Sequence, residues 1–316
     1  MKTYEKLYLI LREKNDYHNG EWLAEKLGIS RTAIWKAIKT LESKGLTFSK
    51  DKHKGYKLES GDLFIPDEIS RQLSIPVTYT EQSQSTQIDA KNNASSESKK
   101  PHLFLASQQS QAKGRLNRDF FTSETGGIYM TLHLKPNQTY DAIEPYTMMV
   151  ASCLVKAISR LTDIETDIKW VNDIFRDGKK VAGILTEAVT SVETGLITDI
   201  YIGVGINFYI KQFPKEIDTI ATSLFDTTPT ITRQDLIIEI WKLFFEVPVA
   251  DLVKVYKEKS LVIEKQVTFE ENNKTITAKA VDITDLGHLV VELEDKTLKT
   301  IRSGEVSLSS WKPGQL

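Results

Sequence analysis

The sequence is poor in several features that would mark other classes of protein. It holds a single cysteine, Cys153, so an intramolecular disulfide and a thiol-based zinc site are excluded, and we expect this thiol to be buried. No apolar run approaches the roughly 18 residues that a membrane-spanning helix needs. Residues 1–16 predict a charged amphipathic helix rather than a signal peptide. We therefore expect a cytoplasmic protein without membrane contact.

The chain also has little net charge, −2 at pH 7, but that charge is unevenly distributed. Residues 1–60 hold 13 Lys or Arg and 8 Asp or Glu, a net of +5, so the remainder carries −7. Between Arg31 and Lys57 there are eight basic and two acidic side chains. A local excess of cations is what a phosphate backbone attracts. The N-terminal part is therefore a candidate nucleic-acid-binding domain.

The same segment predicts a helix-turn-helix. Residues 20–45 predict a short helix, a turn at residues 28–30 and a longer helix that Ser30 caps. We expect Ala24 and Gly28 to be small because the two helices cross closely there. Residues 48–58 then predict a two-stranded wing with a Lys-rich tip.

This arrangement predicts which side chains would contact DNA. The outer face of the second helix would enter the major groove while the wing tip lies against phosphates. The predicted contacts are Ser30, Arg31, Thr32, Trp35, Lys36, Lys52 and Lys54. The alternative is a three-helix interaction module with a solvated basic face.

The rest of the chain predicts two more domains of an α+β protein. Short apolar strands alternate with helices after residue 77, which is typical of a mixed sheet, and only short strands follow residue 261, which is typical of a small β-barrel. We expect strands at 77–81, 103–107, 128–134, 168–171, 181–189 and 197–208, and helices at 143–161 and 233–257. The predicted domains are residues 1–61, 66–260 and 261–316.

Three polar segments of the central domain suggest ligand binding. Residues 113–118, KGRLNR, place three cations in a loop that would repel itself unless an anion neutralises it. Residues 203–207, GVGIN, offer two glycines for close ligand approach, and residues 84–87, QSTQ, place hydrogen-bonding side chains at a strand-to-helix junction. A solvated loop, a glycine-rich strand end and a plain helix cap are the respective alternatives.

The stretch KWVNDIFRDGKKVAGILTE, residues 169–187, predicts a β-hairpin. Residues 168–171 would pair with residues 181–189 across a turn at Asp177-Gly178. A hairpin alone does not explain why Asn172, Asp173 and Lys180 gather near the ends of apolar strands.

Together these segments resemble the biotin protein ligases, in particular the bifunctional type that is also a biotin-dependent repressor. Residues 169–187 are similar to the family's KWPND…KxAGILxE signature, and QQSQAKGRLNR, residues 108–118, to its QxxGRGRxxR loop. QSTQ is similar to its STN segment, and GVGIN and ATSL, residues 221–224, to its GxGIN and ATSL elements. The resemblance covers essentially the whole chain and implies that the C-terminal barrel is SH3-like.

The resemblance implies a reaction and a set of site residues. Biotin would be activated with ATP and Mg²⁺ to biotinyl-5'-AMP and then transferred to a lysine of a biotin carboxyl carrier protein domain. Lys180, Arg115 and Arg118 match the catalytic positions. The implied biotin contacts are Ser85, Thr86, Gln87, Gln109, Lys113, Gly114, Arg115, Lys180 and Gly183, and the implied ATP contacts are Arg118, Asn172, Asp173 and Asn207. No metal ligand is assigned.

The sequence departs from the family pattern at several positions. Ala112 and Lys113 stand where the loop has Gly and Arg, and Lys keeps the charge without the bidentate geometry. Gln87 replaces Asn, Val171 replaces Pro and Phe120 replaces Trp. We predict retained ligase activity with a looser hold on the adenylate.

The resemblance also predicts regulation. Biotinyl-AMP would order the cationic loop and favour a homodimer through an edge of the central sheet, so that two winged helices bind operator DNA. One alternative is a biotin-sensing repressor without efficient ligase activity, and another is a lipoate-type ligase on the same fold.

Overall fold

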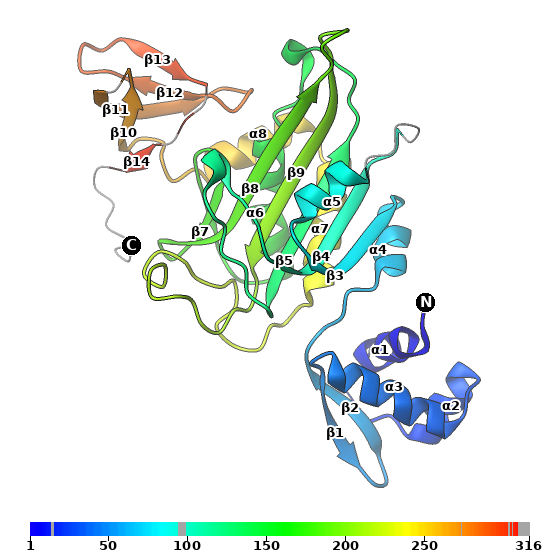
Figure 1. Ribbon diagram of the computed structural model, residues 1–316. Coiled ribbons are helices and arrows are strands. Elements are labelled where there is room, and N and C mark those ends of the chain that lie inside the picture. The colour runs from blue at the N-terminus through cyan, green and yellow to red at the C-terminus, as the bar shows by residue number, and fades with distance from the viewer. Residues whose placement is uncertain (14–15, 94–98, 273, 303, 305, 309–316) are drawn as a thin grey trace. The chain divides into compact units, whose positions relative to one another are not determined.

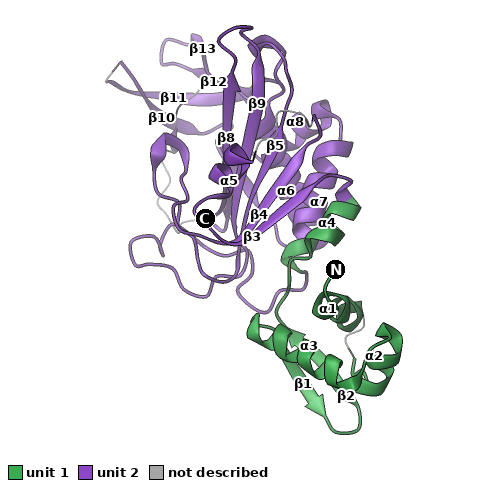
Figure 2. Ribbon diagram, turned by 45° about the vertical axis from the view of Figure 1, so that its right-hand side comes forward, with its two compact units in different colours: residues 1–72, 232–235 green, residues 73–231, 236–316 purple. Residues whose placement is uncertain are grey.

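The computed structural model consists of two units (Figure 2). Unit 1 comprises residues 1–72 and 232–235, and unit 2 comprises residues 73–231 and 236–316. The structure describes residues 1–13, 16–93, 99–272, 274–302, 304 and 306–308. The three domain ranges derived from the sequence stay a prediction.

Unit 1 contains the predicted helix-turn-helix and wing. Ser30 caps the second helix of the motif, because its Oγ accepts a hydrogen bond from the amide of Ala33 at 3.2 Å. The wing strands pair antiparallel, with Phe48 opposite Leu58. The elements are α1 (Thr3–Glu13), α2 (Gly20–Leu27), α3 (Arg31–Ser43), β1 (Thr47–Asp51), β2 (Gly55–Ser60) and α4 (Pro66–Leu73).

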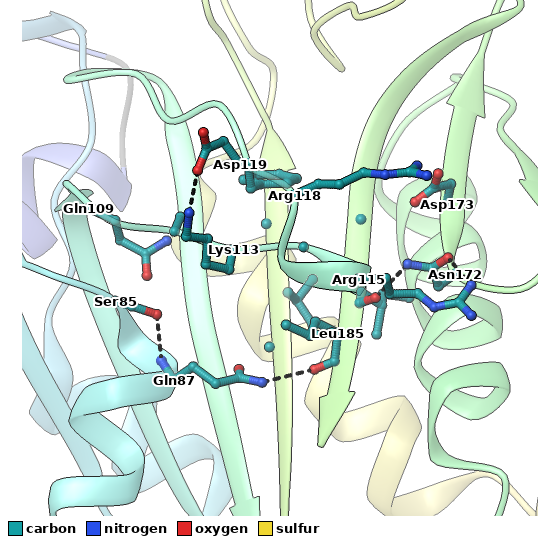
Figure 3. A pocket seen from close by; sticks show the side chains of 18 of the residues that line it. Ser85, Gln87, Gln109, Lys113, Arg115, Arg118, Asp119, Asn172, Asp173 and Leu185 are labelled. Atoms are coloured by element: carbon teal, nitrogen blue, oxygen red, sulfur yellow. Dashed lines mark hydrogen bonds and ion pairs between the residues drawn. The ribbon is translucent and has the colours of Figure 1, made fainter. Parts of the chain in front are cut away.

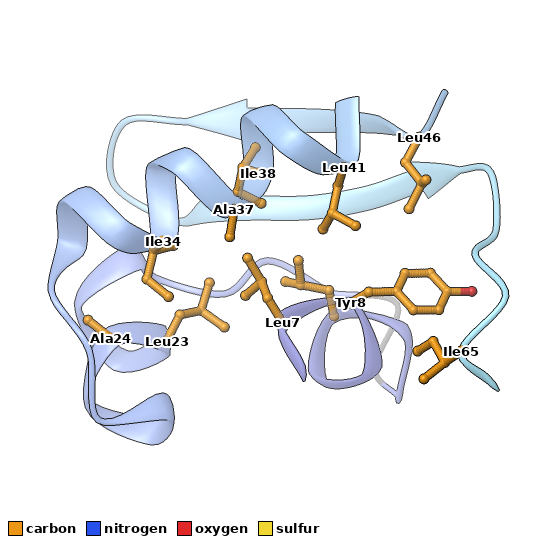
Figure 4. Packing of buried hydrophobic residues seen from close by; sticks show 11 residues of the cluster. Leu7, Tyr8, Leu23, Ala24, Ile34, Ala37, Ile38, Leu41, Leu46 and Ile65 are labelled. Carbon is orange, nitrogen blue, oxygen red and sulfur yellow. The ribbon is translucent and has the colours of Figure 1, made fainter. Parts of the chain in front are cut away.

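Apolar side chains from α1, α2 and α3 form one core in unit 1 (Figure 4). Leu7 and Leu23 pack against the inner face of α3, and Ala24 is buried as predicted. Gly28 has a different role from the one predicted. Nothing lies within 4 Å of the position of its missing Cβ, and its φ of +65° ends α2 in the left-handed conformation.

The segment after the wing belongs to this unit rather than forming a loose connection. Ile65 is fully buried in the core, and its amide donates to Gln234 Oε1 at 2.8 Å. Asp62 accepts from the Arg233 amide at 2.6 Å and from Arg233 Nε at 2.7 Å. Residues 232–235 therefore pack with the helix-turn-helix and wing although they follow them by more than 150 positions.

Unit 2 is built on the predicted mixed sheet (Figure 1). The strand order is β3-β4-β5-β9-β8-β7-β6, in which only β3 and β4 pair parallel. The elements are β3 (Val77–Ser83), α5 (Thr86–Asn92), β4 (His102–Gln109), η1 (Arg115–Asn117), β5 (Gly127–Leu134), η2 (Tyr140–Ala142), α6 (Tyr146–Leu161), β6 (Asp167–Lys169), β7 (Asp173–Arg176), β8 (Lys179–Thr190), β9 (Ile197–Asn207), α7 (Arg233–Glu246) and α8 (Val249–Glu258).

Helices cover both faces of this sheet. Thr131 of β5 contacts Thr86 of α5, whereas its neighbour Met130 accepts a hydrogen bond from Trp241 of α7. Because successive side chains of a strand point to opposite faces, α5 lies on one face and α7 on the other. The same alternation on β8 places Thr186 against α6. The α5 face carries the cavity described below.

Two sequence predictions for unit 2 were wrong. The strand at residues 168–171 does not pair across the Asp177-Gly178 turn, since β7 takes that place and β6 pairs with the far side of β7. A four-residue strand was too short for its pattern to be recognised. The helix predicted at residues 233–257 is two helices, because Pro248 cannot supply the amide hydrogen that a continuous helix needs.

The last segment forms five antiparallel strands in the order β13-β12-β11-β10-β14. Their bounds are β10 (Gln266–Glu271), β11 (Lys274–Ile283), β12 (Leu289–Glu292), β13 (Leu298–Ile301) and β14 (Ser307–Leu308). Elsewhere in unit 2, Cys153 is fully buried in α6 as predicted, and burial raises its pKa to about 12. Among the described residues, no helix is both long and apolar enough to cross a bilayer.

Candidate active site

A cavity of about 330 Å³ opens on the α5 face of the central sheet (Figure 3). Its walls come from the β3–α5 junction, the loop after β4, and strands β7, β8 and β9. It brings together all the predicted ligase-site residues except Asn207: Ser85, Thr86, Gln87, Gln109, Lys113, Gly114, Arg115, Arg118, Asn172, Asp173, Lys180 and Gly183. These residues are spread over 99 positions of the chain, so folding alone assembles the site.

Asn207 lies outside the cavity lining. It is buried at the end of β9, and its Nδ2 donates to the carbonyl of Thr222 at 3.1 Å. The predicted contact of Asn207 with ATP therefore stays a prediction.

One end of the cavity is cationic. Four cations line the cavity, Lys113, Arg115, Arg118 and Lys180, against the two carboxylates of Asp119 and Asp173. Lys180 Nζ lies 2.6 Å from Asp173 Oδ1, which positions the ammonium at the mouth of the β7–β8 hairpin. This end is suited to a ligand that carries several negative charges.

Asn172 lies in the turn between β6 and β7, and Asp173 begins β7, so this turn brings both residues to the cavity. Asn172 Nδ2 donates to the carbonyl of Ile184 at 2.7 Å, and the Ile184 amide donates back to the Asn172 carbonyl at 3.0 Å. Arg115 Nη1 reaches Asn172 Oδ1 at 3.4 Å. From α8, the Tyr256 hydroxyl donates to the Val171 carbonyl at 2.8 Å, and burial holds its pKa well above the usual range.

The cationic loop contains its own anion, which the sequence prediction overlooked. Lys113 Nζ lies 2.5 Å from Asp119 Oδ1, and the Gly114 amide donates to the Arg118 carbonyl at 2.8 Å. The Phe120 amide also donates to the Ala112 carbonyl at 3.0 Å. The loop is therefore a closed hairpin in which the Lys113 charge is already paired without a ligand.

The other end of the cavity is neutral and buried. Ser85 caps α5 by accepting from the Gln87 amide at 3.2 Å, so the helix cap that was the alternative for residues 84–87 is present in a segment that also lines the cavity. Gln109 Oε1 accepts from the Thr86 amide at 2.6 Å, which leaves Gln109 Nε2 as a donor at the cavity wall. Hydroxyl and amide groups of this kind recognise a neutral ligand by the direction of its hydrogen bonds.

The two glycines of β9 make room for protein side chains. A Cβ on Gly203 would lie 2.2 Å from Gln87 Oε1, and one on Gly205 would lie 2.5 Å from the Phe120 ring. Both glycines also line the cavity, so the predicted close approach of a ligand to them stays a prediction. Phe120 also lies under Lys180, whose Nζ is 5.9 Å from the ring centroid. Aromatic contact thus helps to hold the ammonium in place.

Unit 1 carries the second candidate site. Four of the predicted DNA-contacting side chains are exposed on α3, where Trp35 is 51% exposed, and Lys52 and Lys54 are exposed at the wing tip. Asp51 Oδ1 shapes that tip by accepting from the amides of His53 and Lys54 at 2.8 Å each. The exposed residues of α3 are Arg31, Thr32, Trp35 and Lys36.

Comparison with known proteins gives a match for three parts of the chain. Residues 4–57 match the HTH domain, residues 77–207 the Biotin/lipoate A/B protein ligase family, and residues 262–309 the Biotin protein ligase C terminal domain. The bifunctional ligase/repressor BirA of Bacillus subtilis is 31% identical over 311 residues, covering 93% of this chain and 94% of that protein. The chain belongs to the family of bifunctional biotin ligase/repressors.

Further relatives agree with this assignment. The bifunctional ligase/repressor BirA of Escherichia coli K12 is 26% identical over 318 residues, covering 96% of both chains. The biotin protein ligase from Aquifex aeolicus in complex with biotin and ATP has a TM-score of 0.61 and 26% identity, covering 73% of this chain and 97% of that one. The predicted fold class, with a winged helix-turn-helix, a mixed-sheet ligase domain and an SH3-like C-terminal domain, is confirmed.

Proposed function

We propose that this chain activates biotin with ATP to biotinyl-5'-AMP, transfers biotin to a lysine of a biotin carboxyl carrier protein domain, and represses transcription by binding operator DNA. The observation that carries the proposal is the division of the cavity into a cationic end and a neutral, hydrogen-bonding end. Biotin has a carboxylate at one end and a cyclic urea at the other. The carboxylate and the ATP phosphates would lie at the cationic end and the urea at the neutral end.

The first step joins two anions, so it needs cations held in place. A biotin carboxylate oxygen attacks the α-phosphorus, and the bond from that phosphorus to the β-phosphate bridging oxygen breaks, which releases pyrophosphate. Lys180, held by Asp173, is suited to contact both the carboxylate and the α-phosphate. Arg115 and Arg118 would neutralise the remaining phosphate charge. Ion pairs of this kind lower the barrier because they are already oriented before charge develops.

The second step transfers the acyl group. The neutral amine of the acceptor lysine attacks the acyl carbon, the bond to the phosphate oxygen of AMP breaks, and AMP leaves while the amine proton passes to solvent. The polar neutral end favours a cyclic urea over the apolar dithiolane of lipoate, because Ser85, Thr86 and Gln109 present hydrogen-bonding groups there.

Magnesium is assigned only as part of the Mg-ATP substrate. Among the described residues, no group of three or more His, Cys, Asp or Glu side chains is arranged to hold a metal ion. Magnesium is usually held by one or two carboxylates together with substrate phosphates, so we expect it to bind with ATP.

A transfer assay tests the ligase proposal. The purified protein is incubated with Mg-ATP, a biotin carboxyl carrier domain, and either biotin or lipoate, with ATP omitted in a control. We expect ATP-dependent biotin on the acceptor lysine and no lipoate. Transfer of lipoate would overturn the substrate assignment, and biotin binding without transfer would make the protein a sensor-repressor that has lost the chemistry.

We propose further that biotinyl-AMP promotes a homodimer through the edge of the central sheet. Strand β3 is an edge strand of that sheet and only partly buried, so it offers backbone groups for pairing. A two-fold dimer would present two winged helices to a two-fold operator, and the acceptor domain would compete for the same edge. Gel filtration with and without biotin and ATP tests this, and an unchanged monomer population would contradict it.

DNA binding is tested with duplexes selected from a random pool, because the operator is unknown. In the cytoplasm, the phosphate backbone and the groove of DNA would be contacted by the basic residues Arg31, Lys36, Lys52 and Lys54. Lys54→Ala should weaken binding to all sequences and lower the salt dependence by about one counterion. Lys254→Ala, an exposed lysine of α8, is the matched control. An unchanged salt dependence of DNA binding in Lys54→Ala would show that the wing tip does not contact DNA.

A further inference from the structure

A chain of hydrogen bonds runs from the protein surface to the neutral end of the cavity. Lys91 Nζ donates to Glu187 Oε2 at 2.9 Å, and Gln87 Nε2 donates to the same oxygen at 2.8 Å. Thr131 Oγ1 lies 3.2 Å from Gln87 Oε1 and 2.9 Å from Thr86 Oγ1. The inner three residues are at most 8% exposed, so water has little access to these bonds.

The orientation of the Gln87 amide follows from its neighbours. On one side it meets Glu187 Oε2 and, at 3.3 Å, the carbonyl oxygen of Leu185. The Leu185 carbonyl has no proton to donate. Burial would raise the pKa of Glu187, but the hydrogen bond from Lys91 helps to hold that pKa below its usual value, so Glu187 also accepts. The amide nitrogen must therefore lie on this side, and the amide oxygen must face Thr131.

This orientation determines the direction of the remaining bonds. The Gln87 oxygen can only accept, so the single hydroxyl proton of Thr131 is donated to it. Thr131 Oγ1 also lies 2.9 Å from Thr86 Oγ1. Because its own proton is used, Thr131 must accept this second hydrogen bond, and Thr86 must donate it. Thr86 has only lone pairs left for the cavity that it lines.

The neighbouring hydroxyl has the opposite polarity. Ser85 Oγ accepts from the Gln87 amide, so a lone pair is used and its proton stays available to donate. Ser85 and Thr86 thus offer the cavity a donor beside an acceptor. A cyclic urea presents the complement, a carbonyl oxygen beside an N–H group.

We infer that Thr131 and Gln87 are positioning residues that hold the Thr86 hydroxyl as an acceptor for a ring N–H group of the substrate. The inference rests on the proposed function, since it assumes that the urea occupies the neutral end. Thr131 is not among the described residues that line the cavity, so it acts through Thr86. It determines ligand selectivity without contact with the ligand.

The test compares Thr131→Val, which removes the hydroxyl, with Thr131→Ser, which keeps it. Without the Thr131 acceptor, the Thr86 proton is no longer held away from the cavity. We expect Thr131→Val to raise KM for biotin roughly tenfold while KM for ATP stays within about twofold, and Thr131→Ser to restore the wild-type KM. Thr198→Val is the matched control, because Thr198 is a half-buried residue of β9 that does not line the cavity and donates to the Val189 carbonyl at 3.3 Å.

A second measurement uses the biotin analogue in which both ring N–H groups are replaced by oxygen. The wild-type protein should bind it at least about tenfold more weakly than biotin, because Thr86 then meets an acceptor. In Thr131→Val this ratio should fall several-fold, since the freed hydroxyl can donate to the ring oxygen. This ratio is insensitive to a general loss of stability or of active protein.

Specific outcomes overturn the inference. An equal rise of both KM values in Thr131→Val, or an unchanged ratio between biotin and the analogue, would make Thr131 a structural residue only. Failure of the proposed function is distinguishable, because the wild-type protein itself would then transfer no biotin.

Discussion

The two ends of the cavity differ in burial as much as in charge. At the cationic end, the side chains of Lys180 and Asp173 are 34% and 26% exposed, and the Asp119 carboxylate is 90% exposed. At the neutral end, Thr86, Gln87 and Thr131 are 3%, 8% and 0% exposed. Attraction between charges tolerates water and imperfect angles, whereas a neutral ligand is recognised only where water is excluded and each proton has one direction.

The comparison implies a division of work. The cationic end would promote adenylate formation for any carboxylic acid that binds in the cavity. The neutral end would determine which acid binds. The predictions below alter one end at a time, so that an effect on the wrong kinetic constant would contradict the division.

Removing Lys180 should have the largest effect. Lys180→Ala takes away the cation that would contact both reacting anions, so adenylate formation should fall about 100- to 1,000-fold. Lys179→Ala is the matched control, because Lys179 Nζ donates to the Asp218 carbonyl outside the cavity. Pyrophosphate release measures the step. Equal losses in both variants would place the catalytic charge elsewhere.

Adding a methyl group on β9 should separate the two ends. Gly203→Ala would press on Gln87 at the neutral end and should raise KM for biotin about tenfold or more with little change for ATP. Gly205→Ala would press on Phe120 beneath Lys180 and should lower kcat instead. Steady-state kinetics with each substrate varied separately make this measurement. The same change in both variants would mean that the ends are not independent.

Freeing Lys113 should have a smaller effect. Asp119→Asn removes the carboxylate that pairs with Lys113 and adds one net positive charge to the cationic end. Exposed ion pairs contribute little, so we expect KM for ATP to fall about twofold at low salt and no change at high salt. A large loss of activity would show instead that the loop depends on this pair for its shape.

The smallest effect concerns pH. The pKa of Glu187 is lowered in the folded protein, so its stabilising contribution is present above the unfolded pKa and is lost as pH falls through the folded pKa. The stability difference between wild type and Glu187→Gln should therefore be constant from pH 6 to 8 and shrink below about pH 4. Thermal unfolding across this pH range measures the difference. A stability difference that grows as pH falls would contradict a lowered pKa of Glu187.

Much of the fold could be predicted from the sequence, because local patterns carry it. The helix-turn-helix followed from the spacing of Ile34, Ile38 and Leu41 and from the Ser30 cap, which lie within about three turns of helix. The long strands β5, β8 and β9 followed from their apolar runs. The short strand β7 did not, because four residues hold too little pattern.

The candidate site was predictable in part and for a different reason. Resemblance to a family picked out most residues that line the cavity, but it gave no contacts. Asp119 was missed, although it directly follows the cations of residues 113–118 and pairs with one of them. Thr131 was missed although a polar residue inside the apolar run of β5 is a detectable signal.

Periodicity and capping are local, so the helix-turn-helix, its wing and the mixed sheet could be predicted from the chain alone, while the cavity residues came from short motifs that resemble a family. Three features needed the folded structure: the pairing of Lys113, the space that the glycines of β9 leave for Gln87 and Phe120, and the contact between Thr86 and Thr131. Each of these depends on groups brought together from distant parts of the chain, where an acceptor on one strand determines the direction of a proton on another.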